Sequence, residues 1–382
     1  MGEALFTHIG AKNHFLGAEL TALLPEKTPD IYIEPFGGSF GLGIQSGYDP
    51  SNVVMIHNDL DKVIHAIFKA VTQFPEETLD SVYDLLDIFE CDQCTVDYFN
   101  YLLVHKDLTG ENLLRDDVYL GAAAWILKTI TFNGDCRNVQ HNKGVDSIEH
   151  MMKIFEKREY TAYGLEGVQA VRMDAMQMLE CMKRTGKGHG KEIFIYIDAP
   201  YSHSGGRKTK HDLYEVDIDK DDNMIVKLAR ILEEINQSTD CKIMASEYDN
   251  PIYNEVLTRE KGWEKVKVRD VHKSMSVADR YGCKPVETEY IWRNYNEYGK
   301  LSPHIVETTS GQVGDNTMES KKIAEGATRS RYKVEVSFLG TANDKQVEEE
   351  VTAILKDKFL AKMTSCNSES VALESTPDNE KY

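Results

Sequence analysis

The sequence predicts an α/β protein: a three-layer sheet that carries a helical insert and a small C-terminal appendage. Short apolar and β-branched runs alternate with segments of helical periodicity, the pattern of a largely parallel sheet covered by helices. Several runs end in glycine-rich or acidic turns, where open α/β sheets bind their ligands. The block 76–164 shows helical periodicity only, so we expect it to be an insert. A chain of 382 residues is long enough for this arrangement.

The amino-terminal part reads as a helix, a strand, a glycine-rich turn, a second strand and a second helix. Apolar residues recur at helical spacing over 15–24, and Pro25 ends that helix. β-branched and aromatic residues predict strands over 30–33 and 53–59. A helix over about 60–72 is expected after the second strand.

Strand–helix alternation resumes after the insert. Helices are expected over 168–182, 223–236 and 252–259, and strands over 193–197, 241–245, 266–271 and 286–292. Residues 1–75 and 165–300 therefore form the expected core. Residues 301–330 read as a linker, 331–363 as a β–α appendage and 364–382 as a disordered acidic tail.

Composition argues against several classes of protein. The seven cysteines are scattered and we expect no signal peptide, which indicates reduced thiols in a cytoplasmic setting. Cys91 and Cys94 form a single C-x-x-C pair, and a structural zinc ion needs four ligands, so no metal site is expected. No apolar run approaches the ~20 residues that span a bilayer, so no membrane partner is expected.

Charge is distributed unevenly along the chain. The net charge of −19 argues, taken alone, against a nucleic-acid partner. Residues 75–120 hold twelve acidic against two basic residues, whereas 259–284 hold eight basic against four acidic residues. Together with the basic run 207–211, this favours a phosphate-bearing substrate whose affinity depends on salt. The acidic segment 76–117 and the appendage are candidate surfaces for a protein partner.

The turn Asp198-Ala199-Pro200-Tyr201 directly follows the strand predicted over 193–197. A carboxylate, a proline-containing bend and an aromatic side chain therefore emerge together at the carboxyl end of a strand, where such sheets bind ligands. The carboxylate and a backbone carbonyl can accept the hydrogens of an exocyclic amine while the tyrosine stacks on the ring. The tetrapeptide is common, so this interpretation depends on a second motif upstream.

The second motif is the glycine-rich segment from Glu34 to Gly43, which follows the first predicted strand. Glycines at a strand-to-helix turn let the backbone approach a ligand closely and leave amides available for hydrogen bonds. Asp59 ends the second strand 22 residues after Gly37, the spacing at which nucleoside-binding folds place a carboxylate on ribose hydroxyls. Glycines alone fit an ordinary tight turn, but strand, glycine turn, strand and acid in this order favour a nucleoside site.

Six sequence elements occur in the order typical of one enzyme family. They are Gly10-Ala11-Lys12, Glu34 to Phe40, Asn58-Asp59-Leu60, Phe132-Asn133-Gly134, Asp198 to Tyr201, and a looser element from Glu289 to Tyr295. The chain thereby resembles the Dam-type family of DNA adenine N6-methyltransferases, the alpha group of S-adenosylmethionine-dependent amino-methyltransferases. The resemblance covers about residues 7–296. It implies a Rossmann-like methyltransferase sheet with a helical insert for target recognition.

Two residues depart from the family pattern. Phe40 stands where the second glycine of the loop is usual, and Gly41 follows it. Ala199 replaces the first proline of the family's D-P-P-Y signature, which keeps the main-chain carbonyl but loses the fixed φ of proline. We expect a less preorganised turn and slower chemistry from the second change.

The resemblance implies a role for each motif. S-adenosylmethionine is the expected cofactor, Asp59 its expected ribose ligand and Asp174 a candidate ligand of its adenine amine. The expected cofactor-binding residues are Lys12, Glu34, Pro35, Phe36, Gly37, Gly38, Ser39, Phe40, Gly41, Asp59 and Asp174. The expected catalytic residues are Asp198, Ala199, Pro200 and Tyr201. They would act on an adenine flipped out of double-stranded DNA, without a metal or a nucleophilic cysteine.

DNA recognition is expected from the second half of the insert, because Arg, Asn and Gln side chains read base edges. The basic stretches further along the chain would contact phosphates. The expected nucleic-acid-binding residues are Asn133, Arg137, Asn138, Gln140, Asn142, Lys143, Arg207, Lys208, Lys210 and Lys273. The resemblance also implies the cytoplasm of a bacterial or phage-infected cell.

Three alternatives stay open from the sequence. The same grip on an exocyclic amine would serve methylation of cytosine N4 or of RNA. A relative that has lost turnover would remain a nucleic-acid-binding module. A nucleotide-dependent dehydrogenase would explain the glycine-rich turn and Asp59, but it would leave Asp198 to Tyr201 unexplained.

Overall fold

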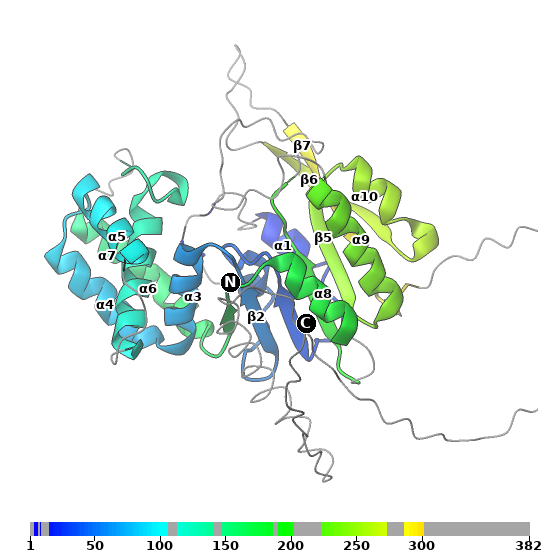
Figure 1. The fold of residues 1–382 in the computed structure, drawn as a ribbon, viewed down its shortest axis with the longest axis horizontal. Helices are drawn as coiled ribbons and strands as arrows, with labels where there is room; N and C mark the ends of the chain where they lie inside the picture. The colour runs from blue at the N-terminus through cyan, green and yellow to red at the C-terminus, as the bar shows by residue number, and fades with distance from the viewer. Residues whose placement is uncertain are drawn as a thin grey trace, which may run out of the picture. The chain divides into compact units, whose positions relative to one another are not determined.

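The structure is a computed structural model that describes residues 4–6, 8, 15–105, 113–140, 147–185, 190–201, 223–272 and 286–301 (Figure 1). The chain divides into two units, Met1–Thr308 and Thr309–Tyr382, and every described residue belongs to the first. The linker, appendage and tail expected after residue 301 therefore lie outside the described residues, as does the whole G-x-K element, Gly10-Ala11-Lys12.

A seven-stranded sheet forms the centre of the described unit, in the order β3-β2-β1-β4-β5-β7-β6. Its strands are β1 Ile31–Glu34, β2 Val54–Asn58, β3 Gln169–Val171, β4 Ile193–Ile197, β5 Lys242–Tyr248, β6 Glu264–His272 and β7 Val286–Arg293. Strands β1 to β5 are parallel, and β7 runs antiparallel between β5 and β6. The strand order reverses between β1 and β4, which is where such sheets bind ligands.

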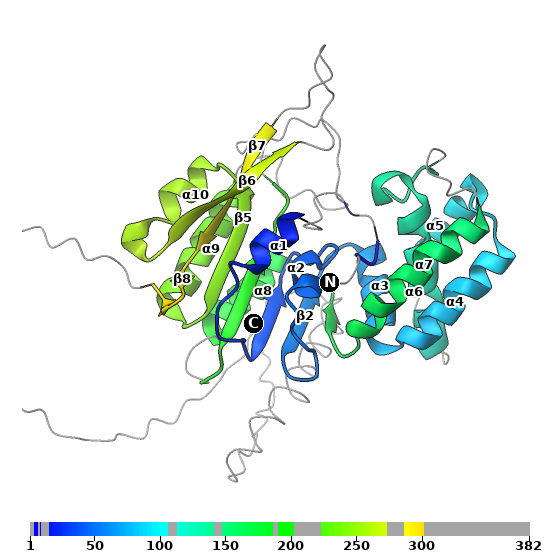
Figure 2. The same cartoon turned by 180° about the vertical axis from the view of Figure 1, so that it is seen from behind.

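Helices cover the two faces of the sheet, so the expected three-layer α/β architecture is confirmed. Helices α8 and α9 pack together on one face, and α1 and α2 lie on the other (Figures 1 and 2). The bounds are α1 Phe15–Thr21, α2 Gly41–Gln45, α3 Lys62–Gln73, α8 Ala175–Thr185, α9 Asn223–Ser238 and α10 Pro251–Val256. A short pair, β8 Tyr295–Asn296 and β9 Gly299–Lys300, was not expected from the sequence.

The segment between α3 and β3 is helical and packs around one apolar helix. Its elements are α4 Pro75–Ile88, α5 Gln93–His105, α6 Leu113–Ile130, the 3-10 turn Phe132–Gly134 and α7 Ile148–Gly164. Helix α6 contacts α3, α4 and α5, and its residues from Ala122 to Leu127 are buried. A helix that is apolar on all sides needs neighbours all round, which explains its central place.

The helix expected over 168–182 was wrong in its first part. Residues Gln169–Val171 form β3, which pairs in parallel with the end of β2, and α8 begins only at Ala175. Asp174 marks the boundary, because its Oδ1 accepts the backbone N–H of Gln177 at 2.9 Å in the manner of a helix cap. Three residues are too few to show strand alternation, and only pairing with β2 makes them a strand.

Candidate active site

The Asp198 carboxylate stands at the carboxyl end of β4 and is held by the neighbouring strand β5. The Ser246 hydroxyl donates a hydrogen bond of 3.0 Å to Asp198 Oδ1, and it lies 3.1 Å from the Tyr196 hydroxyl. Ser246 and Ala199 are buried, whereas Asp198 is half-buried. The Ser246 hydroxyl of strand β5 thus fixes one oxygen of the Asp198 carboxylate. Ser246 carried no signal in the sequence, because its role depends on strand pairing.

The Tyr201 ring is positioned from two sides. Its hydroxyl donates a hydrogen bond to the buried Glu289 of β7, and its ring meets that of Tyr248 edge to face with centroids 4.6 Å apart. Burial, followed by Glu289 and Asp198, raises the pKa of the Tyr201 hydroxyl well above its ordinary value. The phenol therefore stays protonated. Glu289 opens the late element noted in the sequence, but Tyr248 was missed.

The glycine-rich segment is tied to the end of β2. The Gly37 amide donates to the Asn58 carbonyl at 2.7 Å, and the Gly38 amide donates to Asp59 Oδ2 at 2.8 Å. A Cβ built on Gly37 would lie 2.4 Å from the ring of His57, so only glycine fits there. Gly38 has a φ of 48°, in the left-handed region that favours glycine.

Phe40 occupies a backbone position that glycine takes in the family pattern. Its φ is 55°, which costs an L-residue roughly 1–2 kcal/mol. The ring is 0 % exposed and meets Tyr32, His57 and Phe68 edge to face. The side chain therefore enters the core and leaves the outer side of the loop to backbone groups. Packing of the ring offsets the strain of the backbone.

Glu34, at the end of β1, is a buried acid below the loop. It is 2 % exposed, and its Oε1 accepts the Tyr32 hydroxyl at 2.5 Å and the Gly43 amide at 2.9 Å. Burial raises the pKa of Glu34 to about 8, and the charge of Asp198 adds to the shift. Through its bond to the Gly43 amide, Glu34 fixes the start of α2, and its carboxyl group lies close enough to Asp198 for the two charges to interact.

Asp59 and Asp174 reach the same edge of the sheet. Asp59 accepts the Asp61 amide at 2.8 Å in addition to Gly38, and burial raises its pKa to about 6, with Asp61 opposing ionisation. The Asn58 amide group donates to Pro35 O at 2.7 Å and to Met173 O at 3.0 Å. These bonds bring the loop before Asp174 against the glycine-rich segment.

The expected DNA-reading residues form a separate group in the insert. Residues Arg137, Asn138 and Gln140 follow the 3-10 turn at the end of α6, whereas the side chain of Asn133 is outside the described part. The remaining expected residues, Lys12, Asn142, Lys143, Arg207, Lys208, Lys210 and Lys273, lie outside the described residues.

In the described part of the chain, no group of three or more His, Cys, Asp or Glu side chains is placed to hold a metal ion. None of the described helices is both long and apolar enough to cross a membrane.

Comparison with known proteins assigns the family. Residues 8–272 match the family described as D12 class N6 adenine-specific DNA methyltransferase, a span that contains the glycine-rich segment, the insert and the Asp198 turn. No curated protein matches the chain significantly. The match agrees with the Dam-type resemblance, selects adenine over cytosine N4 and DNA over RNA, and implies S-adenosylmethionine as methyl donor. The chain belongs to the D12 class N6 adenine-specific DNA methyltransferases and is a transferase that methylates N6 of adenine in DNA.

Proposed function

We propose that Asp198, Ala199, Pro200 and Tyr201 hold the target adenine of this reaction. The Asp198 carboxylate and the Ala199 carbonyl accept the two N6 hydrogens, and Tyr201 stacks on the ring once the base has left the duplex. One observation carries the proposal: Asp198 stands at the switch point of the sheet, held by Ser246 on the adjacent strand. The contacts of Tyr201 with Glu289 and Tyr248 support its role, because they fix its ring before a base arrives.

The glycine-rich segment fits the amino-acid and ribose portions of S-adenosylmethionine, which supplies the methyl group. Ser39 and Gly41 are buried at the turn between β1 and α2, so their backbone amides lie at a strand-to-helix turn of the kind that binds charged groups. We assign these amides to the cofactor together with Asp59 for the ribose and Asp174 for the adenine amine. Residues Glu34 to Phe36 shape the loop from below, and Lys12 completes the assigned set.

The chain's own residues promote transfer by positioning and by charge. Hydrogen bonds from N6 to Asp198 and the Ala199 carbonyl draw the nitrogen lone pair out of conjugation and aim it at the methyl group. Positive charge develops on N6 during transfer, and Asp198 lies nearest to it. The buried Glu247 and Glu289 lie near the same edge of the sheet and, together with Asp198, form a fixed negative environment that stabilises this charge.

DNA is assigned to the insert and to the basic segments. Arg137, Asn138 and Gln140, continued by Asn142 and Lys143, read base edges, and the basic residues after Tyr201 and β6 contact phosphates. The acidic helices α4 and α5 face away from DNA and offer a surface to a protein partner. Such an enzyme works where DNA is, in the cytoplasm of a bacterial or phage-infected cell.

Nucleoside mass spectrometry of unmethylated DNA incubated with the protein and S-adenosylmethionine tests this proposal. Methyl-adenine should form with the wild type and fall by about 100-fold or more in Asp198→Ala, in line with the loss of one preorganised group. Asp249→Ala is the matched control, because Asp249 follows β5 as Asp198 follows β4 but pairs with Lys265. If Asp198→Ala and Asp249→Ala form equal amounts of methyl-adenine, Asp198 has no role in the reaction. Methyl-cytosine would contradict the adenine assignment.

A further inference from the structure

A short irregular segment of the insert, Thr131–Gln140, is held firmly by its neighbours; we call it the recognition turn. The Phe132 amide donates to Asn138 O at 2.9 Å, and the Cys136 amide donates to Thr131 Oγ1 at 3.0 Å. Helix α5 donates two bonds, from Asn100 to Cys136 O at 2.7 Å and from Gln93 to Arg137 O at 2.8 Å, and Gln93 Oε1 accepts the Val139 amide at 3.4 Å. The backbone that carries the expected DNA-reading side chains is therefore fixed.

One buried cation joins the recognition turn to another part of the molecule. Lys128, near the end of α6, is 5 % exposed and donates a hydrogen bond of 2.9 Å to Gly134 O. Its ammonium group also lies 3.9 Å from Asp61 Oδ2, at the start of α3. A buried ammonium is costly unless paired, so Lys128 depends on both partners.

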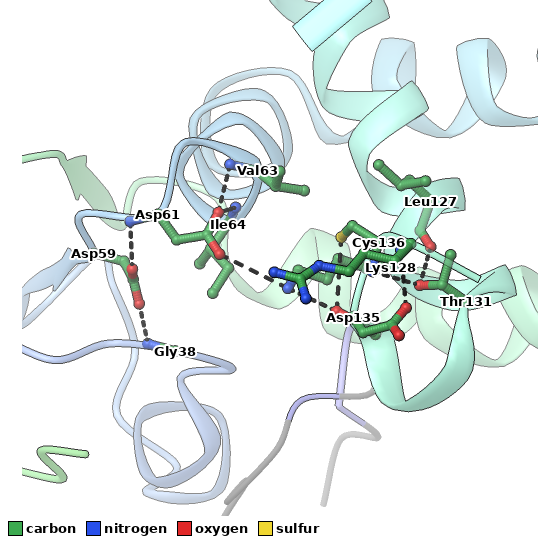
Figure 3. Close-up of polar contacts among 12 residues, drawn as sticks. Gly38, Asp59, Asp61, Val63, Ile64, Leu127, Lys128, Thr131, Asp135 and Cys136 are labelled. Carbon is green, nitrogen blue, oxygen red and sulfur yellow. Dashed lines mark hydrogen bonds and ion pairs between the residues drawn. The ribbon is translucent and has the colours of Figure 1, made fainter. Parts of the chain in front are cut away.

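Asp61 leads from Lys128 to the glycine-rich segment. Its Oδ1 caps α3 by accepting the amides of Val63 and Ile64, and its own amide donates to Asp59 Oδ1 at 2.8 Å. The other oxygen of Asp59 accepts the Gly38 amide. Figure 3 shows this continuous line of contacts, from Gly38 through Asp59 and Asp61 to Lys128 and the recognition turn.

We propose that Lys128 is a positioning residue that couples occupation of the glycine-rich segment to the geometry of the recognition turn. The inference rests on the proposed function, which assigns the cofactor to the first segment and DNA to the second. A ligand that engages Asp59 changes the hydrogen bonding of the Asp61 amide, and Asp61 is the anionic partner of Lys128. Because Lys128 also holds Gly134 O, a shift at Asp61 reaches the turn through one side chain.

A second ion pair provides a matched control for a merely structural role. Lys69 of α3 and Asp117 of α6 lie 3.0 Å apart, so they join the same two helices as Asp61 and Lys128. Among the described residues, no hydrogen bond or ion pair joins Lys69 or Asp117 to the glycine-rich segment or to the recognition turn. A Lys69→Met variant removes an α3–α6 ion pair without breaking the proposed coupling.

Hydrogen–deuterium exchange with and without S-adenosylhomocysteine tests the proposal on the full chain. The product should slow exchange in peptides covering 131–140 in the wild type and in Lys69→Met. Lys128→Met should still bind the product but lose this ligand-dependent protection, and Lys128→Arg should regain most of it. If Lys128→Met does not fold, Asp61→Asn serves instead, because asparagine caps a helix as well as aspartate and removes only the charge.

The outcomes separate this inference from the proposed function. Failure of the wild type to bind S-adenosylhomocysteine would contradict the cofactor assignment. Binding with no protection of 131–140 in the wild type, or with equal protection in Lys128→Met, would overturn the coupling while leaving the cofactor site intact.

Discussion

The glycine-rich segment and the recognition turn use the same backbone device but stabilise it differently. Each contains a non-glycine residue in the left-handed region, Phe40 with a φ of 55° and Cys136 with a φ of 60°. Phe40 is held by its ring, which is buried against three aromatic side chains. Cys136 is half-buried, and its turn is held by hydrogen bonds from Lys128, Asn100 and Gln93.

This difference matches the work proposed for each segment. A segment that binds one cofactor gains from packing, which is stiff and independent of partners across the surface. A segment that reads DNA sequence must keep its polar side chains exposed to the solvent. Its backbone is therefore held by hydrogen bonds from α5 and α6 to its carbonyl groups. Substitutions should therefore damage the first segment through lost apolar burial and the second through lost hydrogen bonds.

Phe40→Ala should show the largest effect, because the ring fills a fully buried site. We expect a loss of about 3–5 kcal/mol in the free energy of unfolding and weaker binding of S-adenosylhomocysteine. Phe155→Ala is the control: Phe155 is equally buried, but it packs on Trp125 inside the insert. Urea unfolding and calorimetric titration measure the two quantities. Unchanged cofactor affinity in Phe40→Ala would show that the ring does not shape the loop.

Glu34 should make stability depend on pH. Its folded-state pKa of about 8 lies above the ordinary value of 4.5, so folding takes up a proton between these values. The wild type should therefore lose stability as pH rises through this range, by up to about 1.4 kcal/mol per pH unit. Glu34→Gln keeps an oxygen acceptor for Tyr32 and Gly43 but should lack this slope. Parallel profiles from urea unfolding at several pH values would contradict the assignment.

Asn100→Ala should have the smallest effect on stability, about 1–2 kcal/mol, since it leaves one carbonyl of the recognition turn without its donor. DNA binding should weaken while cofactor binding stays unchanged. Asn52→Ala, which removes an exposed bond to Asp49 before β2, is the control. Filter binding to DNA and calorimetry with S-adenosylhomocysteine compare the two variants. Equal DNA affinity in both would show that α5 does not support the turn.

Much of the fold could be predicted from the sequence, because its strands are short apolar runs with clear ends. Strand β4 has the bounds expected for it, 193–197, and helix α9 begins at Asn223 as expected. Strand β3 could not be predicted, because its three residues become a strand only through pairing with β2. The order of β6 and β7 in the sheet was equally hidden, since it depends on contacts between distant segments.

The site shows the same limit at the level of side chains. Asp198, Tyr201 and Glu34 stand directly after or within apolar runs, so their place at the end of a strand could be read locally. Ser246 and Lys128 act through partners 48 and 67 residues away. A serine inside an apolar strand and a lysine at the end of a helix look ordinary until the partner strand or helix is in place.

The place of β7 between β5 and β6 has a consequence for synthesis of the protein. The ribosome completes β6 before β7, yet β6 joins the sheet only through β7. Until residues 286–293 emerge, β5 exposes an open hydrogen-bonding edge, which is a hazard for aggregation. Glu289, the acceptor for Tyr201, arrives on that same late strand. The nascent chain therefore cannot assemble its proposed grip on adenine before β7 covers the open edge of β5.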